Sequence, residues 1–307
     1  MRSVSTHQPL MGTVVELRID GDQAAVALAE VSVIAEIQRL EKIFSAFDPD
    51  SELSRWRSGE TDVVGVELVE LLTIASWWQA RGLGSYNPAV EVITDVWKRA
   101  EVTGTPPSDV ELAALAASID APRYSIADGR LFRLGDCGVV NFNAVAKGLI
   151  ADRGAGVGMA VAGVEAITVN AGGDLVHRGV GSITVGIEDP RNPFDNAPPL
   201  TAMTIHDEGV ATSGGARRGF DVGGRWHSHV IDPRTGQSVD GVLSATVVAD
   251  DAVTADVVAT IASVLTPVEA VRFVEGLDGV GCYIVDAAGT TWQDSLWTSR
   301  SEDVAPT

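Results

Sequence analysis

The sequence predicts an α+β fold in which a mixed, largely antiparallel sheet is flanked by helices. Apolar residues recur at helical spacing through much of the first half, whereas from residue 166 onward short β-branched runs are separated by Gly, Asp, Asn and Pro. Strands and helices do not alternate regularly, so a parallel sheet of βαβ units is not expected. No linker, repeat or low-complexity run divides the chain. We therefore predict one domain over residues 1–300, with a frayed tail at 301–307.

The first half contains most of the predicted helices. A strand is expected at residues 11–19, where β-branched and polar side chains alternate, and a long amphipathic helix follows at 23–47. Further helices are predicted at 66–81, 92–99 and 108–119, and Ser51 is suited to cap a short one. Residues 124–134 form a predicted hairpin, because Asp128-Gly129 is a strong turn pair.

The segment at residues 136–152, DCGVVNFNAVAKGLIAD, combines features of an anion site. It predicts a short strand end that breaks at Asn141 into a helix ending near residue 162, with Asn141 as a favoured cap. Lys147 lies one turn inside this helix, and Gly148 follows it. Free N–H groups, the positive end of the helix dipole and an ammonium together favour an anion such as phosphate. The alternative is an ordinary capped helix with a solvated lysine.

The second half is predicted to supply most of the strands. Short strands are expected within AITVNAGGDLVHRG, SITVGIEDP, PLTAMTIHDEGVATSG and WHSHVIDPRTGQSV, and another at residues 244–250. Helices are predicted at 254–265 and 267–277, followed by terminal strands around 281–285 and 290–297.

Charge and composition limit the classes of partner. The formal net charge is −20, which argues against nucleic acid or an anionic membrane as a partner, because both require a basic surface. The two cysteines, Cys137 and Cys282, are expected to be buried thiols, with a single disulfide as the alternative. No apolar run has the length of a signal peptide or a membrane span. We therefore expect a cytoplasmic protein without a membrane anchor.

The sequence TADVVAT, which begins at Thr254, indicates a metal site. Asp256 and Thr260 are four residues apart on a predicted helix and therefore share one face. A carboxylate and a hydroxyl are hard oxygen donors, which Mg²⁺ accepts together with water and substrate phosphates. The alternative is that Thr254 or Asp256 only caps the helix.

A histidine and two glycine turns complete the candidate groups. His229, in HVIDPRTG, is the best general-base candidate because its intrinsic pKa lies nearest neutrality. Alternatively, it is a half-buried strand residue, and Asp232 caps its own turn. The turns in TSGG and NAGGD are suited to close backbone approach, and Arg217 and Arg218 after the first turn carry positive charge for a phosphate.

Eight stretches in a fixed order resemble one known family. They are MGT at Met11, FSAF at Phe44, NPAV at Asn87, AVAKG at Ala144, VNAGGD at Val169, ATSGG at Ala211, HVIDPRTG at His229 and TADVVAT at Thr254. Together they resemble the ApbE family of FAD:protein FMN transferases over nearly the whole chain. The resemblance implies an ApbE-like fold and an Mg²⁺-dependent enzyme. Such an enzyme splits FAD at its pyrophosphate, releases AMP and attaches FMN by a phosphoester to a Thr or Ser of an acceptor protein.

The resemblance also implies roles for individual residues. Asp256 and Thr260 correspond to metal ligands, joined by the backbone carbonyl of Ala144. FAD-contacting positions are Met11, Phe47, the segment around Trp97, Asn141, Lys147 and His229. His229 is in addition the expected base for the acceptor hydroxyl.

Two departures from the family pattern leave alternatives open. Asn141 replaces an aspartate that contacts FAD in the family, and it retains hydrogen-bonding capacity without the charge. The chain also shows no secretion signal of the kind that many family members carry. The alternatives are an FAD pyrophosphatase that forms FMN and AMP, and a non-catalytic FAD-binding protein.

Overall fold

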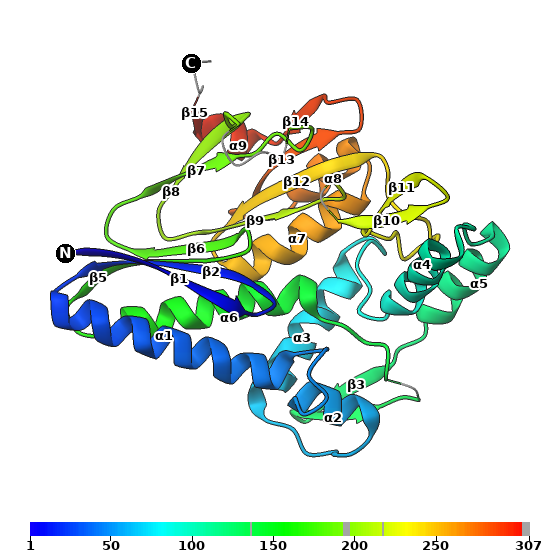
Figure 1. The fold of residues 1–307 in the computed structure, drawn as a ribbon, viewed down its shortest axis with the longest axis horizontal. Coiled ribbons are helices and arrows are strands. Elements are labelled where there is room, and N and C mark those ends of the chain that lie inside the picture. Colours follow the sequence, from blue (N-terminus) through cyan, green and yellow to red (C-terminus); the bar gives the residue numbers. More distant parts are fainter. Residues whose placement is uncertain (136, 193–196, 217, 303–307) are drawn as a thin grey trace.

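The computed structural model describes residues 1–135, 137–192, 197–216 and 218–302. Within these ranges the main sheet has eight strands in the order β1-β2-β5-β6-β9-β12-β13-β14, and each neighbouring pair is antiparallel. Helices flank the sheet, as Figure 1 shows. The predicted α+β class with a largely antiparallel sheet is therefore confirmed.

The elements have the following bounds. The main sheet contains β1 (Arg2–Leu10), β2 (Thr13–Gly21), β5 (Val164–Ala171), β6 (Asp174–Gly179), β9 (Gly209–Ser213), β12 (Val242–Ala249), β13 (Gly281–Asp286) and β14 (Thr291–Gln293). Smaller sheets pair β7 (Ile183–Ile187) with β8 (Thr201–Ile205) and β15 (Ser301–Glu302), β10 (Gly219–Val222) with β11 (Arg225–Ser228), and β3 (Tyr124–Ala127) with β4 (Arg130–Arg133). The helices are α1 (Gln23–Phe44), α2 (Glu52–Ser58), α3 (Val66–Arg81), α4 (Glu91–Thr103), α5 (Asp109–Ile119), α6 (Asn143–Met159), α7 (Ala252–Val264), α8 (Pro267–Val274) and α9 (Ser295–Arg300).

Several predicted elements form where local chemistry specifies them. Helix α3 spans the predicted residues 66–81. Ser51 caps α2 by accepting a hydrogen bond from the Ser54 amide at 3.0 Å, and Ser108 caps α5 in the same way. The hairpin β3–β4 turns at Asp128-Gly129, where both residues have positive φ. The interpretation of both cysteines as buried thiols is also confirmed.

Other boundaries differ from the prediction. The first strand, β1, was not expected, because it is an edge strand whose side chains are mostly polar and exposed. The helix predicted at 23–47 ends at Phe44. The strand predicted at 290–297 ends at Gln293 and is followed by helix α9, which begins at Ser295. Asn141 is not the cap of α6. That position belongs to Phe142, and no side chain caps the helix there.

Some predicted features lie outside the described residues. Asp136, the first residue of the segment at 136–152, and Arg217 both lie outside them, as do residues 303–307 of the predicted tail. Ser301–Glu302 pairs with β8. In the part of the chain that the structure covers, no helix is both long enough and apolar enough to cross a membrane.

The two faces of the main sheet are covered differently. Along β9, Ala211 belongs to the large core under α1, α6 and α7, while its neighbour Val210 belongs to a second cluster with Met203 and Trp297. Successive strand residues point to opposite faces. Helices α1, α6 and α7 therefore cover one face, and the sheet of β7, β8 and β15 packs on the other together with α9 (Figure 1).

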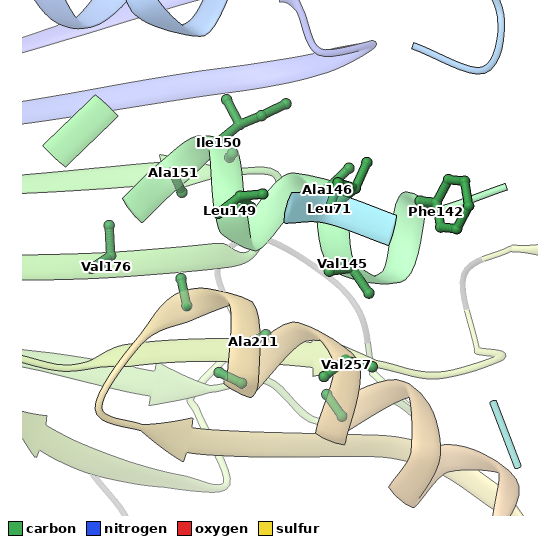
Figure 2. Close-up of a cluster of buried hydrophobic side chains, with 14 of the residues drawn as sticks. Leu71, Phe142, Val145, Ala146, Leu149, Ile150, Ala151, Val176, Ala211 and Val257 are labelled. Carbon is green, nitrogen blue, oxygen red and sulfur yellow. The ribbon is translucent and has the colours of Figure 1, made fainter. Parts of the chain in front are cut away.

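Helix α6 lies at the centre of the helical layer. Its buried residues, including Val145, Leu149 and Ile150, share one cluster with Leu71 of α3 and Val257 of α7 (Figure 2). The crossing with α7 is very close at Gly148, since a Cβ there would lie 2.3 Å from the Ala252 carbonyl oxygen. Glycine is therefore required at this position, and the close crossing brings polar groups of the two helices together.

Candidate active site

The site is built where α6 crosses α7. The Gly148 amide donates a hydrogen bond to Asp256 Oδ2 at 3.1 Å, across a sequence separation of 108 residues. A second contact lies nearby, where the Val253 amide donates to Asp152 Oδ2 at 3.0 Å. The carboxylate of each helix thus accepts a hydrogen bond from the backbone of the other. These contacts fix the position of Asp256 relative to Lys147.

Asp256 does not cap its own helix. The cap of α7 is Asp251, whose side chain accepts a hydrogen bond from the Thr254 amide at 2.6 Å. The alternative in which Thr254 or Asp256 serves only as the cap is therefore wrong. Asp256 instead lies inside the helix with 5% of its surface exposed, among apolar neighbours. A buried carboxylate in such surroundings requires a compensating partner.

Lys147 faces two buried carboxylates. Its ammonium forms an ion pair with Asp174 Oδ2, and Asp256 Oδ1 lies 3.9 Å away. Asp174 begins β6, directly after the Gly172-Gly173 turn, and only 2% of its surface is exposed. Two carboxyl groups face one ammonium, so the cluster carries one surplus negative charge when both are ionised. Among these three residues, Asp174 was not predicted as a site residue, because in VNAGGD it looked like part of a turn.

The pKa values of the cluster follow from burial and charge. Burial raises the pKa of Asp256 to about 7, with a further contribution from the charge of Asp174, while Lys147 acts in the opposite direction. Burial likewise raises the pKa of Asp174. For Lys147, burial lowers the pKa, but Asp256 and Asp174 together outweigh that effect and leave it above its usual value. Lys147 is therefore a permanent cation at neutral pH.

The predicted metal ligands fit a divalent cation chemically. Asp256 and Thr260 lie four residues apart on α7 and share a face, and Ala144 begins the turn of α6 that leads to Gly148. Carboxylate, hydroxyl and carbonyl oxygens are the donors that Mg²⁺ prefers. The surplus negative charge of the cluster also favours a cation. The described residues contain no group of three or more His, Cys, Asp or Glu side chains arranged around one ion, so a metal here needs the hydroxyl, the carbonyl and water.

His229 follows β11 and is exposed to solvent. Its Nδ1 lies 3.1 Å from the carbonyl oxygen of Arg218, which only accepts hydrogen bonds. Nδ1 must therefore carry the proton, which leaves Nε2 as the basic nitrogen. Desolvation lowers the pKa of His229, and the charges of Arg218 and Lys147 lower it further. The imidazole is therefore neutral at pH 7.

The other predicted FAD-contacting residues lie in different environments. Met11 occupies the β1–β2 turn with a φ of 56°, and Phe47 is 77% exposed in the loop after α1. Trp97 is 2% exposed and donates from Nε1 to the Gly236 carbonyl at 3.0 Å. Asn141 accepts from the Asn143 amide at 2.8 Å and donates to Glu91 at 3.2 Å. The roles of these four residues as FAD contacts stay predictions.

Arg57 is a second residue that the sequence did not reveal. Its guanidinium donates to the carbonyl oxygens of Ala46 and Val140, both at 2.8 Å. These carbonyls directly precede Phe47 and Asn141, so Arg57 ties together the two segments that carry them. Arginine suits this position because its planar head presents donors to two acceptors at once. No sequence motif indicates which carbonyls a distant arginine will contact.

The comparison with protein families decides the membership of the chain. The sequence profile described as the ApbE family matches residues 11–284. The chain belongs to the ApbE family. The resemblance drawn from the eight ordered motifs is therefore confirmed.

Two curated relatives share the name FAD:protein FMN transferase. A FAD:protein FMN transferase of Rhodobacter capsulatus is 28% identical over 260 residues, which make up 82% of this chain and 49% of that protein. A FAD:protein FMN transferase of Klebsiella pneumoniae (strain 342) is 28% identical over 300 residues, or 92% of this chain and 85% of that protein. The chain thus spans about half of the first relative and most of the second. These names confirm the prediction of an enzyme of the transferase class.

Solved ApbE structures share the fold. The ApbE protein of Thermotoga maritima superposes with a TM-score of 0.85 at 22% identity, covering 99% of this chain and 100% of the other. The apo form of the Pseudomonas stutzeri flavinyl transferase ApbE gives a TM-score of 0.79 at 21% identity, covering 98% of each chain. At these identities the likeness establishes the architecture alone.

Proposed function

We propose that this ApbE protein is an Mg²⁺-dependent FAD:protein FMN transferase. Its acceptor is a Thr or Ser hydroxyl of another protein, and the new bond is a phosphoester. The proposal rests on one observation above all: Lys147 lies between buried Asp174 and Asp256 at the crossing of α6 and α7. This cluster offers an ammonium for a phosphate and surplus negative charge for a metal ion. The activity names of the relatives support the same proposal.

The residues of the candidate site have different roles in the proposed transfer. Lys147 binds the pyrophosphate of FAD, and Asp256, Thr260 and the Ala144 carbonyl would hold Mg²⁺, which would supply charge neutralisation at the phosphate oxygens. His229 accepts the proton of the acceptor hydroxyl at Nε2. The hydroxyl oxygen forms a bond to the phosphorus on the FMN side, and the bond from that phosphorus to the bridging oxygen breaks. That oxygen leaves with AMP.

The direct test is a transfer assay. The protein is incubated with FAD, Mg²⁺ and a panel of proteins and peptides that contain Thr or Ser, and products are followed by mass spectrometry and by AMP release. An FMN adduct formed together with an equal amount of AMP supports the proposal. FAD binding without an adduct on any acceptor contradicts it.

A second candidate activity is FAD pyrophosphatase. It is favoured by one feature: His229 is open to solvent, so water can approach the base in place of an acceptor hydroxyl. The products would be FMN and AMP in the absence of any acceptor. Measuring free FMN with and without acceptor distinguishes the two activities. FAD binding without AMP release under either condition supports the non-catalytic alternative that Asn141 suggested.

A further inference from the structure

The connection between β9 and β10 carries Arg218 and is held at both of its ends. Before it, a hydrogen bond of 3.2 Å joins the hydroxyl of Ser213 on β9 to the hydroxyl of Ser263 on α7. Ser263 also donates to the carbonyl oxygen of Thr260 at 2.7 Å, and Thr260 is a predicted metal ligand. The start of the connection is therefore fixed to the helix that carries Asp256.

The other end of the connection is held by β11 and by His229. The indole of Trp226 donates from Nε1 to the Gly215 carbonyl oxygen at 3.1 Å. The carbonyl oxygen of Arg218 accepts from the His229 amide at 3.1 Å, and Nδ1 of His229 lies at the same distance from it. The next residue, Gly219, lies against the Trp226 ring, because a Cβ there would be 2.8 Å from the ring. The backbone of Arg218 is thus fixed beside the candidate base.

The side chain of Arg218 has no partner of its own within the protein as described. It is exposed, and its guanidinium forms no ion pair or hydrogen bond with any residue that the structure describes. Beside the larger effects of burial, its positive charge acts to lower the pKa of Lys147, Asp174 and His229. Charges more than about 10 Å apart are largely screened by salt, so the guanidinium lies within that range of all three groups.

The proposed reaction needs a cation beyond Lys147. The Lys147 ammonium is already ion-paired with Asp174, and Asp256 faces it as well. With both carboxyl groups ionised and Mg²⁺ bound, these residues and the ion together carry one net positive charge. The pyrophosphate of FAD carries two negative charges, so one of them stays uncompensated. An arginine with free donors compensates it through charge-assisted hydrogen bonds to phosphate oxygens.

We infer that Arg218 binds the phosphate on the FMN side of the FAD pyrophosphate, which is the phosphate that the acceptor hydroxyl attacks. Arg218 is assigned to this phosphate because its carbonyl holds His229, the proposed base for that hydroxyl. The planar guanidinium donates to the non-bridging oxygens in a bidentate manner, while Lys147 supplies its ammonium from α6. The inference rests on the proposed function, because it takes FAD as the bound substrate.

The test measures equilibrium binding without turnover. The probes are FMN, AMP and riboflavin with Mg²⁺, and FAD without the metal. Arg218→Gln should weaken binding of FAD and FMN about tenfold or more, and it should leave AMP and riboflavin unchanged. Arg218→Lys keeps the charge but lacks the planar fork, so its loss should be smaller. Unchanged FMN affinity in R218Q overturns the inference, and so does a loss that affects AMP instead of FMN.

Arg225 provides a matched control on the same hairpin. It is exposed and pairs with Val222 at the turn of β10–β11, whereas Arg218 precedes Gly219 at the other end. The two ends of β10 lie about 10 Å apart. Arg225→Gln removes the same charge and should leave every affinity unchanged. The free energy of unfolding of R218Q should equal that of the wild type, because the variant loses no contact among the described residues and keeps the carbonyl that holds His229.

The imidazole of His229 gives a second readout that needs no ligand. Burial lowers its pKa, and the charges of Arg218 and Lys147 lower it further. The pKa of His229, followed by NMR in the ligand-free protein, should therefore rise in R218Q and stay constant in R225Q. An unchanged value in R218Q would place the guanidinium away from the site and overturn the inference.

The outcomes separate this inference from the activity itself. If the wild type binds FAD but modifies no acceptor, the transferase proposal fails, whereas weaker binding of FAD and FMN by R218Q still supports the phosphate site. If the wild type transfers FMN and R218Q binds FMN as tightly as the wild type does, only the role of Arg218 is wrong. If the wild type binds neither FAD nor FMN, both proposals fail.

Discussion

Lys147 faces two buried carboxyl groups, and protonation of one of them, Asp256, controls how the metal-free site responds to pH. The pKa of Asp256 is raised from 3.8 to about 7, chiefly by burial. Between about pH 4 and pH 7 the folded protein therefore holds a proton that the unfolded chain has lost. The free energy of unfolding falls as pH rises through this window.

Replacing Asp256 by Asn tests this account at a single residue. The amide oxygen can still accept from the Gly148 amide, but the group no longer titrates. We expect metal-free D256N to lose less stability than the wild type between pH 5 and pH 8, with a difference on the order of 1 kcal/mol or more. Urea unfolding at the two pH values measures it. Mg²⁺-dependent turnover should be abolished in the same variant, and retention of wild-type activity would remove Asp256 from the metal site.

Asp174→Asn should affect both neighbours of the lost charge. Lys147 loses its ion-pair partner, and FAD binding should weaken about tenfold, because the ammonium is no longer held in one place. The pKa of Asp256 should fall, since Asp174 contributes to its elevation. A smaller loss of stability between pH 5 and pH 8 than in the wild type reports that fall independently of activity. An unchanged pH response would show that Asp174 does not act on Asp256.

At the scale of single residues, the sequence identified the chemical groups of the candidate site better than it identified the contacts that those groups make. Lys147 and Asp256 were identified from their motifs, and their side chains lie within 3.9 Å of one another. Asp174 and Arg57 were missed because their contacts are with residues far away in the sequence. Burial and charge balance, which raise the pKa of Asp256, are also properties of the folded chain that no local pattern contains.

At the scale of elements, the crossing of α6 and α7 provides a sharp comparison between two glycines of one helix. A methyl group at Gly148 would overlap the Ala252 carbonyl, whereas nothing lies within 4 Å of the corresponding position at Gly156. Gly148→Ala should lower the free energy of unfolding by about 2 kcal/mol or more and weaken Mg²⁺ binding, because α7 must move away. Gly156→Ala should raise the free energy of unfolding by up to about 1 kcal/mol, because Ala favours a helix. Calorimetry and metal titration of both variants measure these effects.

The elements that the sequence predicted well are those with local determinants. Ser51, Ser108 and the Asp128-Gly129 turn each fix a boundary within a few residues, and the structure places those boundaries as expected. Strand β1 lacks such a determinant, since its identity comes from pairing with β2 at the edge of the sheet. The short α9 likewise depends on Asp294, whose side chain accepts from the backbone of Leu296 and Trp297.

At the scale of the whole molecule, the net charge of −20 opposes the approach of an anionic nucleotide. Salt screens this repulsion. The association rate constant for FAD should therefore rise between about 20 and 200 mM NaCl, a range over which the Debye length falls severalfold. Riboflavin, which has no phosphate, serves as the neutral control and should show little change. Stopped-flow flavin fluorescence measures both, and a decrease for FAD would indicate steering by local positive charge.

The hydrogen bond from Gly148 to Asp256 joins residues separated by 108 positions, so the two halves of the site meet only when the whole chain is folded. The unfolded chain has no comparable affinity for Mg²⁺ or FAD. Each ligand therefore acts as a global stabiliser, contributing about 2.7 kcal/mol when its concentration is a hundred times its dissociation constant. Chains that have already captured nucleotide and metal would then resist unfolding and proteolysis throughout their length, including at surfaces remote from either ligand.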